Sequence, residues 1–138
     1  MNPSGIRFGP SEIYALIEGA AFHDKILDTL CVGRKRDSDR DETVFLFVKM
    51  KGGEALTRNL RHQIERTIRE GLSPRHVPRF IIQVTDIPVT INGKKVEVAV
   101  KKLISGMNIQ ASSTVSNPEC LSEYVKYRTW EEKSMAKL

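Results

Sequence analysis

Residues 88–95 read Pro88-Val89-Thr90-Ile91-Asn92-Gly93-Lys94-Lys95, an extended segment that runs into a turn. Asn-Gly is a strong signal for a tight turn, because both residues tolerate the backbone angles that it needs. The glycine allows a tight, exposed tip, and Lys94 is then presented as a mobile point charge. Such a charge can stabilise the oxygens of a phosphoryl group during its transfer. By itself, however, the segment fits a solvated hairpin at least as well.

The sequence on either side of this segment predicts regular elements. Leu60, Ile64 and Ile68 recur at helical spacing after Thr57, which suits the N-cap position. The expected elements are a strand at 6–8, a helix from residue 10, strands at 30–33 and 44–48, a helix at 57–71, strands at 80–84 and 88–91, a helix at 96–104 and a short amphipathic helix at 119–130.

This order predicts an α+β fold, in which a short β-sheet containing a β-hairpin is packed by about three helices. Residues 34–42 are charged and suit the connection of the hairpin, whereas the Ser/Thr/Asn-rich residues 108–118 indicate a linker. We therefore place one domain at residues 1–106 and a linker with a C-terminal tail at 107–138.

The composition is that of one globular domain with a basic surface. The chain has 138 residues, of which 40% are hydrophobic and 28% charged, and its net charge is +5. A positive charge favours an anionic partner, but aromatic residues make up only 7% and offer no platform on which bases could stack. We therefore expect no nucleic acid as partner. No apolar run reaches the roughly 20 residues of a membrane-spanning helix, so no membrane span is expected.

The cysteines and histidines do not form a recognisable metal or disulfide pattern. Cys31 and Cys120 are far apart, which indicates two reduced thiols in an intracellular protein. His23, His62 and His76 show no ligand spacing with cysteine or carboxylate. The sequence therefore predicts no metal site.

Two motifs resemble those of a known enzyme superfamily. They are Gly5-Ile6-Arg7-Phe8-Gly9-Pro10-Ser11-Glu12-Ile13 and Pro88-Val89-Thr90-Ile91-Asn92-Gly93-Lys94. In this order they are similar to the last two core motifs of the adenylate-forming superfamily, which includes acyl-CoA synthetases, luciferases and the adenylation domains of peptide synthetases. Either motif alone would be a weak signal, whereas the pair in the right order is a strong one.

Further residues make the resemblance closer to the acetoacetyl-CoA synthetase branch of this superfamily, over nearly the whole chain. They are Ser73-Pro74-Arg75-His76-Val77-Pro78, Asp86-Ile87-Pro88, the run from Asn92-Gly93-Lys94-Lys95 to Lys101-Lys102, and Asn117-Pro118-Glu119. Glu97 stands where the superfamily usually has arginine, but it fits the acetoacetyl branch.

The resemblance implies a two-step ligase and a fold of the small C-terminal lid type. Acetoacetate and ATP would form an acyl-adenylate and pyrophosphate, and CoA would then displace AMP. ATP and CoA are thus the expected substrates, with Mg²⁺ accompanying ATP in the large N-terminal domain. The lid would insert Lys94 for adenylation and then rotate, so that the loop at Gly5 lines the passage for the pantetheine arm of CoA.

The resemblance also suggests roles for four further residues. Arg7 matches an arginine near the nucleotide phosphate, Ser4 and Gly5 match the loop beside the pantetheine thiol, and Arg69 matches an arginine that meets the CoA 3′-phosphate. A guanidinium suits a phosphate group, which agrees with the two arginine assignments. The ordinary alternatives remain open: a salt-bridge partner for Arg7, a turn residue for Ser4 and a solvated helix residue for Arg69.

The sequence contains no phosphate-cradling loop and no pocket for an acid. We therefore expect the chain alone to make no acyl-CoA and to need an N-terminal ATP- and acid-binding domain as its partner. The alternatives are the lid of another short-chain acyl-CoA synthetase, a small basic nucleic-acid-binding module and a regulatory partner domain. The C-terminal Ala136-Lys137-Leu138 resembles the peroxisomal address Ser-Lys-Leu, which predicts a peroxisomal location, with the cytosol as the alternative.

Overall fold

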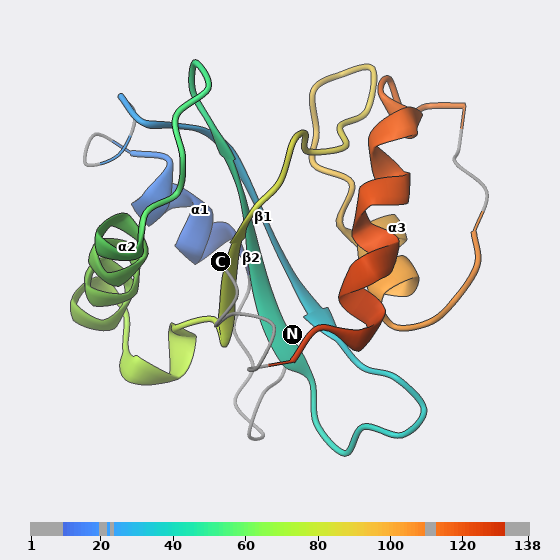
Figure 1. Cartoon of the computed structure of the whole chain (residues 1–138), viewed down its shortest axis with the longest axis horizontal. Helices are drawn as coiled ribbons and strands as arrows, with labels where there is room; N and C mark the ends of the chain where they lie inside the picture. Colours follow the sequence, from blue (N-terminus) through green and yellow to red (C-terminus); the bar gives the residue numbers. More distant parts are fainter. Residues whose placement is uncertain (1–9, 20–21, 23, 110–112, 132–138) are drawn as a thin grey trace.

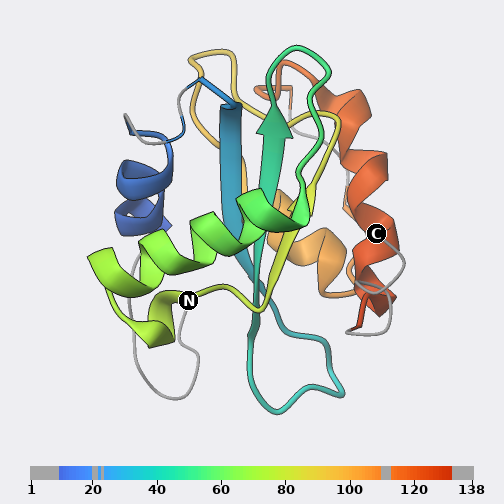
Figure 2. The ribbon, with the colours of Figure 1, turned by 60° about the vertical axis from the view of Figure 1, so that its left-hand side comes forward.

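A three-stranded sheet lies between two groups of helices (Figures 1 and 2). The computed structural model describes residues 10–19, 22, 24–109 and 113–131. In these residues the strands are β1 (Ile26–Arg34), β2 (Thr43–Met50) and β3 (Phe80–Gln83). The helices are α1 (Pro10–Ile17), α2 (Arg58–Gly71), α3 (Glu97–Ile104) and the 3₁₀ helices η2 (Pro74–His76) and η3 (Pro118–Thr129).

The sheet has the order β1-β2-β3 and combines both kinds of strand pairing. β1 and β2 form an antiparallel hairpin in which Cys31 lies opposite Leu46. β2 and β3 run parallel, with Leu46 opposite Ile81. A parallel pair needs a long crossover connection, which α2 supplies here. The predicted α+β fold, with a β-hairpin in a short sheet, is confirmed.

Each strand of the sheet is buried on both faces. Leu46 and Val48 point to the core that includes α1 and α2, whereas Phe45 and Phe47 point to the core that includes α3 and η3. This arrangement explains why residues 44–48 form a continuous apolar run instead of an alternating one. The helices therefore cover the sheet as two layers, one on either side (Figure 1).

The predicted helix at 57–71 is confirmed as α2. The Leu60 N–H donates a hydrogen bond of 3.1 Å to Oγ1 of Thr57, which caps the first turn. Leu60, Ile64 and Ile68 form the buried stripe of the helix. The predicted helices at 96–104 and 119–130 correspond to α3 and η3, whose bounds differ from the expected ones by a residue at most.

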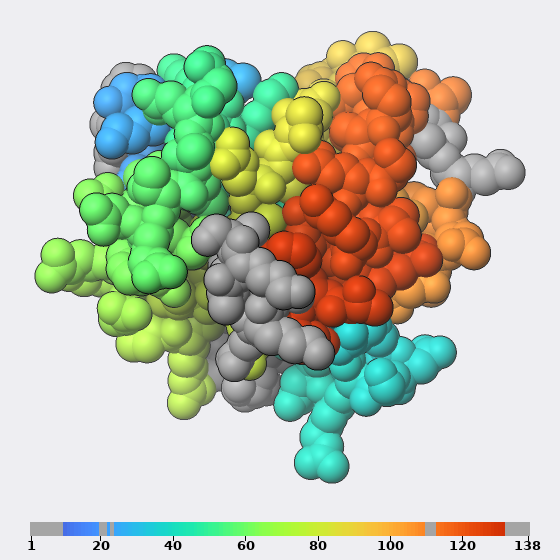
Figure 3. Space-filling view, in the orientation of Figure 1, coloured from blue at the N-terminus to red at the C-terminus, as the bar shows by residue number. Residues whose placement is uncertain are grey.

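Residues beyond 106 share the core of the sheet. Tyr124 and Tyr127 in η3 are fully buried, and their rings lie 4.9 Å and 5.1 Å from the ring of Phe47. Figure 3 shows η3, in orange-red, forming much of one face of the molecule beside the yellow segment that contains β3. The segment expected as linker and tail thus includes a helix that packs against β2.

One detail of the sequence-based prediction is wrong. Residues 88–91 do not form a strand, because Val89 and Thr90 make only isolated pairings, with Lys95 and Val115. The expected linker at 108–118 contacts this segment, since the Ile91 N–H donates 2.8 Å to the Thr114 carbonyl oxygen. The pairing of Thr90 with Val115 joins segments distant in sequence, which no local pattern reveals. The expected strand at 6–8 lies outside the described residues.

Candidate active-site hairpin

The motif at 88–95 folds into a tight hairpin closed by its own backbone. The Thr90 N–H donates to the Lys94 carbonyl oxygen, and the Gly93 N–H donates to the Thr90 carbonyl oxygen, each at 2.8 Å. Gly93 has a φ of +81°, a conformation that residues with a side chain rarely adopt. The turn predicted from Asn92-Gly93 is therefore present, with Lys94 directly after its tip.

Asn117 fixes the first arm of this hairpin. Its Oδ1 accepts from the Val89 N–H at 3.0 Å, and its Nδ2 donates at 2.9 Å to both Asp86 Oδ2 and the Ile87 carbonyl oxygen. Burial raises the pKa of Asp86, but hydrogen bonds from Lys49 and Asn117 outweigh this effect and hold the pKa below its ordinary value. Asp86 therefore stays ionised and keeps Asn117 in place.

The two adjacent lysines of the hairpin have different surroundings. Lys94 is exposed, and no described residue forms a hydrogen bond or ion pair with its ammonium group. Lys95 is only 19% exposed, and its Nζ lies 2.6 Å from Glu18 Oε2 and 2.5 Å from Asp28 Oδ1. Of the two, only Lys94 is placed to meet the anionic oxygens of a ligand.

The hairpin and the start of α3 carry two exposed apolar side chains. Ile91 in the turn and Val98 in the first turn of α3 are 71% and 67% exposed, although both are large and hydrophobic. Between the hairpin and α3 lies an open hollow of about 360 Å³, whose lining includes Thr90, Val96 and Val115. Exposed apolar groups that form a contiguous patch are typical of a docking surface.

Tyr14 joins α1 to the segment that follows the hairpin. Its hydroxyl donates to Glu97 Oε2 and accepts from the Cys31 N–H at 2.9 Å. Burial and the hydrogen bond with Glu97 hold the pKa of Tyr14 well above its ordinary value, so the phenol stays protonated. Glu97, which differs from the superfamily's usual arginine, thus has a defined structural partner.

The other candidate residues lie away from the hairpin or outside the described chain. Arg69 is exposed in the last turn of α2, and no described residue pairs with its side chain. This end of α2 and the hairpin lie at opposite ends of the domain in both ribbon views (Figures 1 and 2). Ser4, Gly5 and Arg7 lie outside the described residues.

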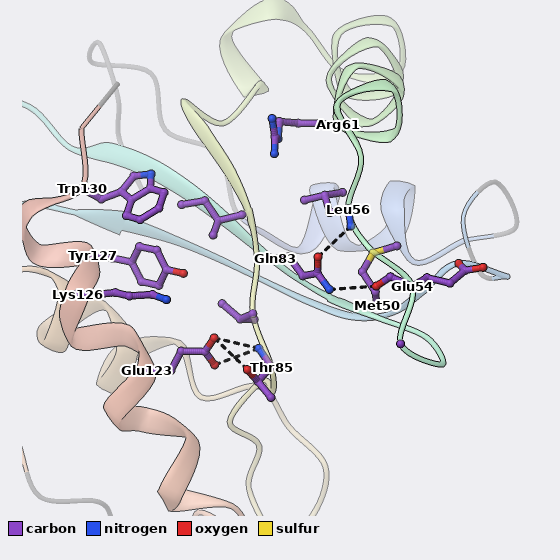
Figure 4. A pocket seen from close by; sticks show the side chains of 13 residues that line it. Met50, Glu54, Leu56, Arg61, Gln83, Thr85, Glu123, Lys126, Tyr127 and Trp130 are labelled. Atoms are coloured by element: carbon purple, nitrogen blue, oxygen red, sulfur yellow. Dashed lines mark hydrogen bonds between the residues drawn. The ribbon is translucent and has the colours of Figure 1, made fainter. Parts of the chain in front are cut away.

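A larger hollow, of about 610 Å³, runs along the outer edge of β3 (Figure 4). Side chains that line the hollow form hydrogen bonds with the backbone of β3 and of the residues just after it. Arg61 Nε donates to the Ile81 carbonyl oxygen at 3.1 Å, and the Thr85 N–H donates to Glu123 Oε1 at 3.0 Å. Because these side chains occupy the edge, they protect it from pairing with another strand. None of the candidate residues lines this hollow.

The described residues form neither a cluster of metal ligands nor a helix that could span a membrane. Within residues 10–19, 22, 24–109 and 113–131, no three His, Cys, Asp or Glu side chains gather where they could hold an ion. In the same part of the chain, no helix is both long and apolar enough to span a membrane. Both cysteines are free and buried.

Comparison with known proteins supports the resemblance inferred from the two motifs. The family described as AMP-binding enzyme C-terminal domain matches residues 18–94. Malonamoyl-CoA synthetase of Penicillium aethiopicum is 47% identical over 94% of this chain. Acetoacetyl-CoA synthetase of Rattus norvegicus is 48% identical over 90% of it. The chain spans only 18% of the length of each of these relatives.

Solved structures show the same fold. Acetoacetyl-CoA synthetase from Streptomyces lividans superposes with a TM-score of 0.76 and 33% sequence identity, over 90% of this chain and 18% of that one. The acyl-CoA synthetase of Brucella canis matches with a TM-score of 0.56 and 29% identity, over 68% of this chain and 17% of that one. By sequence and by fold, this chain belongs to the family of AMP-binding enzyme C-terminal domains.

Proposed function

We propose that this chain is the lid of an AMP-forming acid–CoA ligase and that Lys94 acts in its adenylation step. The observation that carries the proposal is the contrast within the hairpin. Lys95 is paired with Glu18 and Asp28, whereas Lys94 is exposed and directly follows a turn that also exposes Ile91. A nucleic-acid-binding role rested on net charge alone, and the relatives found do not favour it.

The chemistry assigns Lys94 an electrostatic task. In the first step, a carboxylate oxygen of the acid attacks the α-phosphorus of ATP, and the bond to pyrophosphate breaks. The Lys94 ammonium would stabilise the negative charge that builds up on the phosphate oxygens. In the second step, the CoA thiol gives up its proton to water and its sulfur attacks the acyl carbon; the bond between this carbon and the phosphate oxygen breaks, and AMP leaves. Mg²⁺ would accompany ATP in the large domain.

The acid class follows from the names of the relatives. Malonamoyl-CoA synthetase and acetoacetyl-CoA synthetase act on acids that share one feature, a second carbonyl two carbons from the carboxylate. We place the substrate of this protein in the same class, with acetoacetate as the first candidate. The choice between the acids lies in the ATP- and acid-binding domain, which this chain does not contain.

A chimera tests the proposal. In the acetoacetyl-CoA synthetase of Rattus norvegicus, the region that matches this chain would be replaced by it, and pyrophosphate exchange with acetoacetate would be measured. We expect an active chimera, in which Lys94→Ala lowers exchange by about a hundredfold or more, the size typical for losing one electrostatic stabiliser. Lys126→Ala, at an exposed lysine on η3, is the matched control and should leave exchange unchanged.

Two outcomes would contradict the proposal. One is an active chimera in which Lys94→Ala exchanges pyrophosphate as fast as the parent. The other is pyrophosphate exchange by the isolated chain, since this chain should hold only half of the active site.

We also propose a peroxisomal location, supported by the match of Ala136-Lys137-Leu138 to the peroxisomal tripeptide pattern. These residues lie outside the described part of the structure. A fluorescent protein that ends in residues 132–138 should collect in peroxisomes, and the same fusion without the last residue should stay diffuse. A diffuse signal from both fusions would refute the assignment and favour the cytosol.

A further inference from the structure

Lys95 has all of its hydrogen-bonding capacity used inside the domain. Its ammonium donates to Glu18 Oε2, Asp28 Oδ1 and the Thr29 carbonyl oxygen, at 2.6, 2.5 and 2.5 Å. An ammonium group has three N–H donors, so these three oxygens satisfy it completely. Its nitrogen also lies 4.5 Å from the centre of the Tyr14 ring, within the range of a cation–π contact.

The acceptors of this site are themselves held in place. The Thr29 hydroxyl, which is fully buried, donates 2.5 Å to the same Glu18 oxygen, and the Thr29 N–H donates 2.9 Å to the same Asp28 oxygen. A register shift in the pairing of β1 with β2 lies between Ile26 and Asp28, and such bulges redirect side chains. The carboxylates at the end of α1 and in β1 therefore converge on a prearranged position for one cation.

The anchoring of Lys95 determines where Lys94 points. Successive side chains of an extended segment project to opposite sides, and Lys94 directly precedes Lys95 in the arm that follows the tip of the hairpin. If Lys95 is held inward against α1 and β1, the side chain of Lys94 must project outward. The contact between Tyr14 and Glu97 fixes the same arm at a second point, two positions further on.

We propose that Lys95 is a positioning residue that holds Lys94 in the orientation needed for adenylation. This inference rests on the function proposed above for Lys94. In this arrangement Lys95 does not touch substrate: its charge is neutralised within the domain, and it acts only through the backbone that the two lysines share. Glu18, Asp28 and Thr29 together form a fixed binding site for the Lys95 ammonium, which we call the Lys95 socket.

The test uses the active chimera and measures its two half-reactions separately. Lys95→Met keeps much of the stem but removes the charge. Pyrophosphate exchange should fall about tenfold, a part of the roughly hundredfold loss that a 1 Å misplacement can cause. Thioester formation from a supplied acyl-adenylate should not change, because the lid has then turned Lys94 away and α1 is held independently by the buried Ile13 and Ile17.

Controls separate positioning from folding. Lys101→Met removes a lysine that is paired with Glu42 but belongs to α3, and it should leave both half-reactions unchanged. If Lys95→Met does not fold, Glu18→Gln weakens the same socket with little change in shape, and it should lower exchange alone. The proposal is overturned if Lys95→Met slows both half-reactions equally or slows neither. An unimpaired Lys94→Ala chimera would instead refute the proposed function, so the two failures are distinguishable.

Discussion

At the scale of single residues, the two cysteines show how burial sets reactivity. Burial, followed by the charge of Glu97, raises the pKa of Cys31 to about 12. Burial, followed by the charge of Asp86, raises the pKa of Cys120 to about 11. Both thiols are therefore almost entirely protonated at pH 7, and only the thiolate is a good nucleophile.

We predict that neither thiol reacts with a disulfide reagent in the native protein at pH 7. Both should react when urea unfolds the chain, because an exposed cysteine has a pKa of about 8.5. Thiol titration with and without urea measures this difference. A rapid reaction of the folded protein with the reagent would contradict this prediction and show that one of the thiols is accessible.

Arg69 provides a second prediction at this scale. The assignment to the CoA 3′-phosphate requires a guanidinium free to bind, and the side chain is exposed near the end of α2. In the chimera, Arg69→Ala should raise the KM for CoA by about tenfold, the loss of one charge-assisted hydrogen bond, without changing pyrophosphate exchange.

Arg66→Ala is the matched control, because Arg66 lies on the same helix and already pairs with Glu70 at 3.4 Å. An equal rise in KM for both variants would mean that overall charge, not a specific contact, attracts CoA. An unchanged KM for CoA in Arg69→Ala would contradict the assignment of Arg69 to the CoA 3′-phosphate.

Sequence reasoning predicts a role for Lys94, but it could not predict the contacts that fix the hairpin around this residue. The motif predicted the lysine and the turn because both depend on neighbouring residues. The socket of Lys95 includes Glu18, which is 77 positions away, so no local pattern could indicate it. Asn117 was recognised only as part of a resemblance, and its contacts with Val89 and Asp86 also cross distant segments.

At the scale of elements, the end of β1 and the loop that follows it hold the end of η3 in place. The buried Arg34 donates 2.7 Å and 2.8 Å to the carbonyl oxygens of Tyr127 and Trp130, at the helix end where such oxygens lack partners. Arg36 donates 2.6 Å to the Arg128 carbonyl oxygen. The charged loop expected only as a hairpin connection thus fastens the last helix to the sheet.

Asp39 orients one of these arginines. Its carboxylate accepts from Nε and Nη2 of Arg36, each at 2.9 Å, and these hydrogen bonds lower the pKa of Asp39 to about 2. Asp39→Asn should reduce the free energy of unfolding by about 1 kcal/mol at pH 7, the upper end for a surface pair. As the pH falls, Asp39 takes up a proton in the unfolded state before it does so in the folded state, because its pKa is higher in the unfolded chain. This contribution to the free energy of unfolding is therefore lost between about pH 4 and about pH 2.

Urea unfolding of both proteins at pH 7, 4 and 2 measures this effect, and the two free energies should converge at the lowest pH. Asp37→Asn, in the same loop at an exposed position, is the control and should match the parent throughout. A gap between Asp39→Asn and the parent that persists at pH 2 would place its origin in packing instead of in the ion pair.

At the scale of the whole molecule, the sheet and its helices differ in how far the sequence predicted them. α2 and β2 have strong local periodicity and were predicted close to their observed bounds. The packing of η3 on the sheet was not predicted, because its apolar face covers Phe45 and Phe47, which lie far upstream in the sequence. A weakly amphipathic segment after a Ser/Thr-rich stretch looks like a tail until the face that it covers is known.

This packing gives a final prediction about the extent of the folding unit. A chain that ends at Gly106 would lose Leu121, Tyr124 and Tyr127, all buried against the sheet. Burying each such side chain is worth roughly 1.5–3 kcal/mol, and the sum rivals the roughly 5–15 kcal/mol that stabilises a typical domain. We expect the shortened chain to lose its cooperative thermal transition in circular dichroism, whereas the complete chain unfolds in one step.

Point variants in the complete chain make the comparison finer. Tyr127→Ala should cost about 3–5 kcal/mol, as for other large aromatic truncations in a core. Val125→Ala, on the same helix but 39% exposed, should cost far less, about 0.5 kcal/mol. If the chain ending at Gly106 kept a sharp transition at the same temperature, η3 would be an attachment to the domain. If the transition is lost, the sheet needs helices on both faces, and the hairpin that carries Lys94 depends on the last helix for its stability.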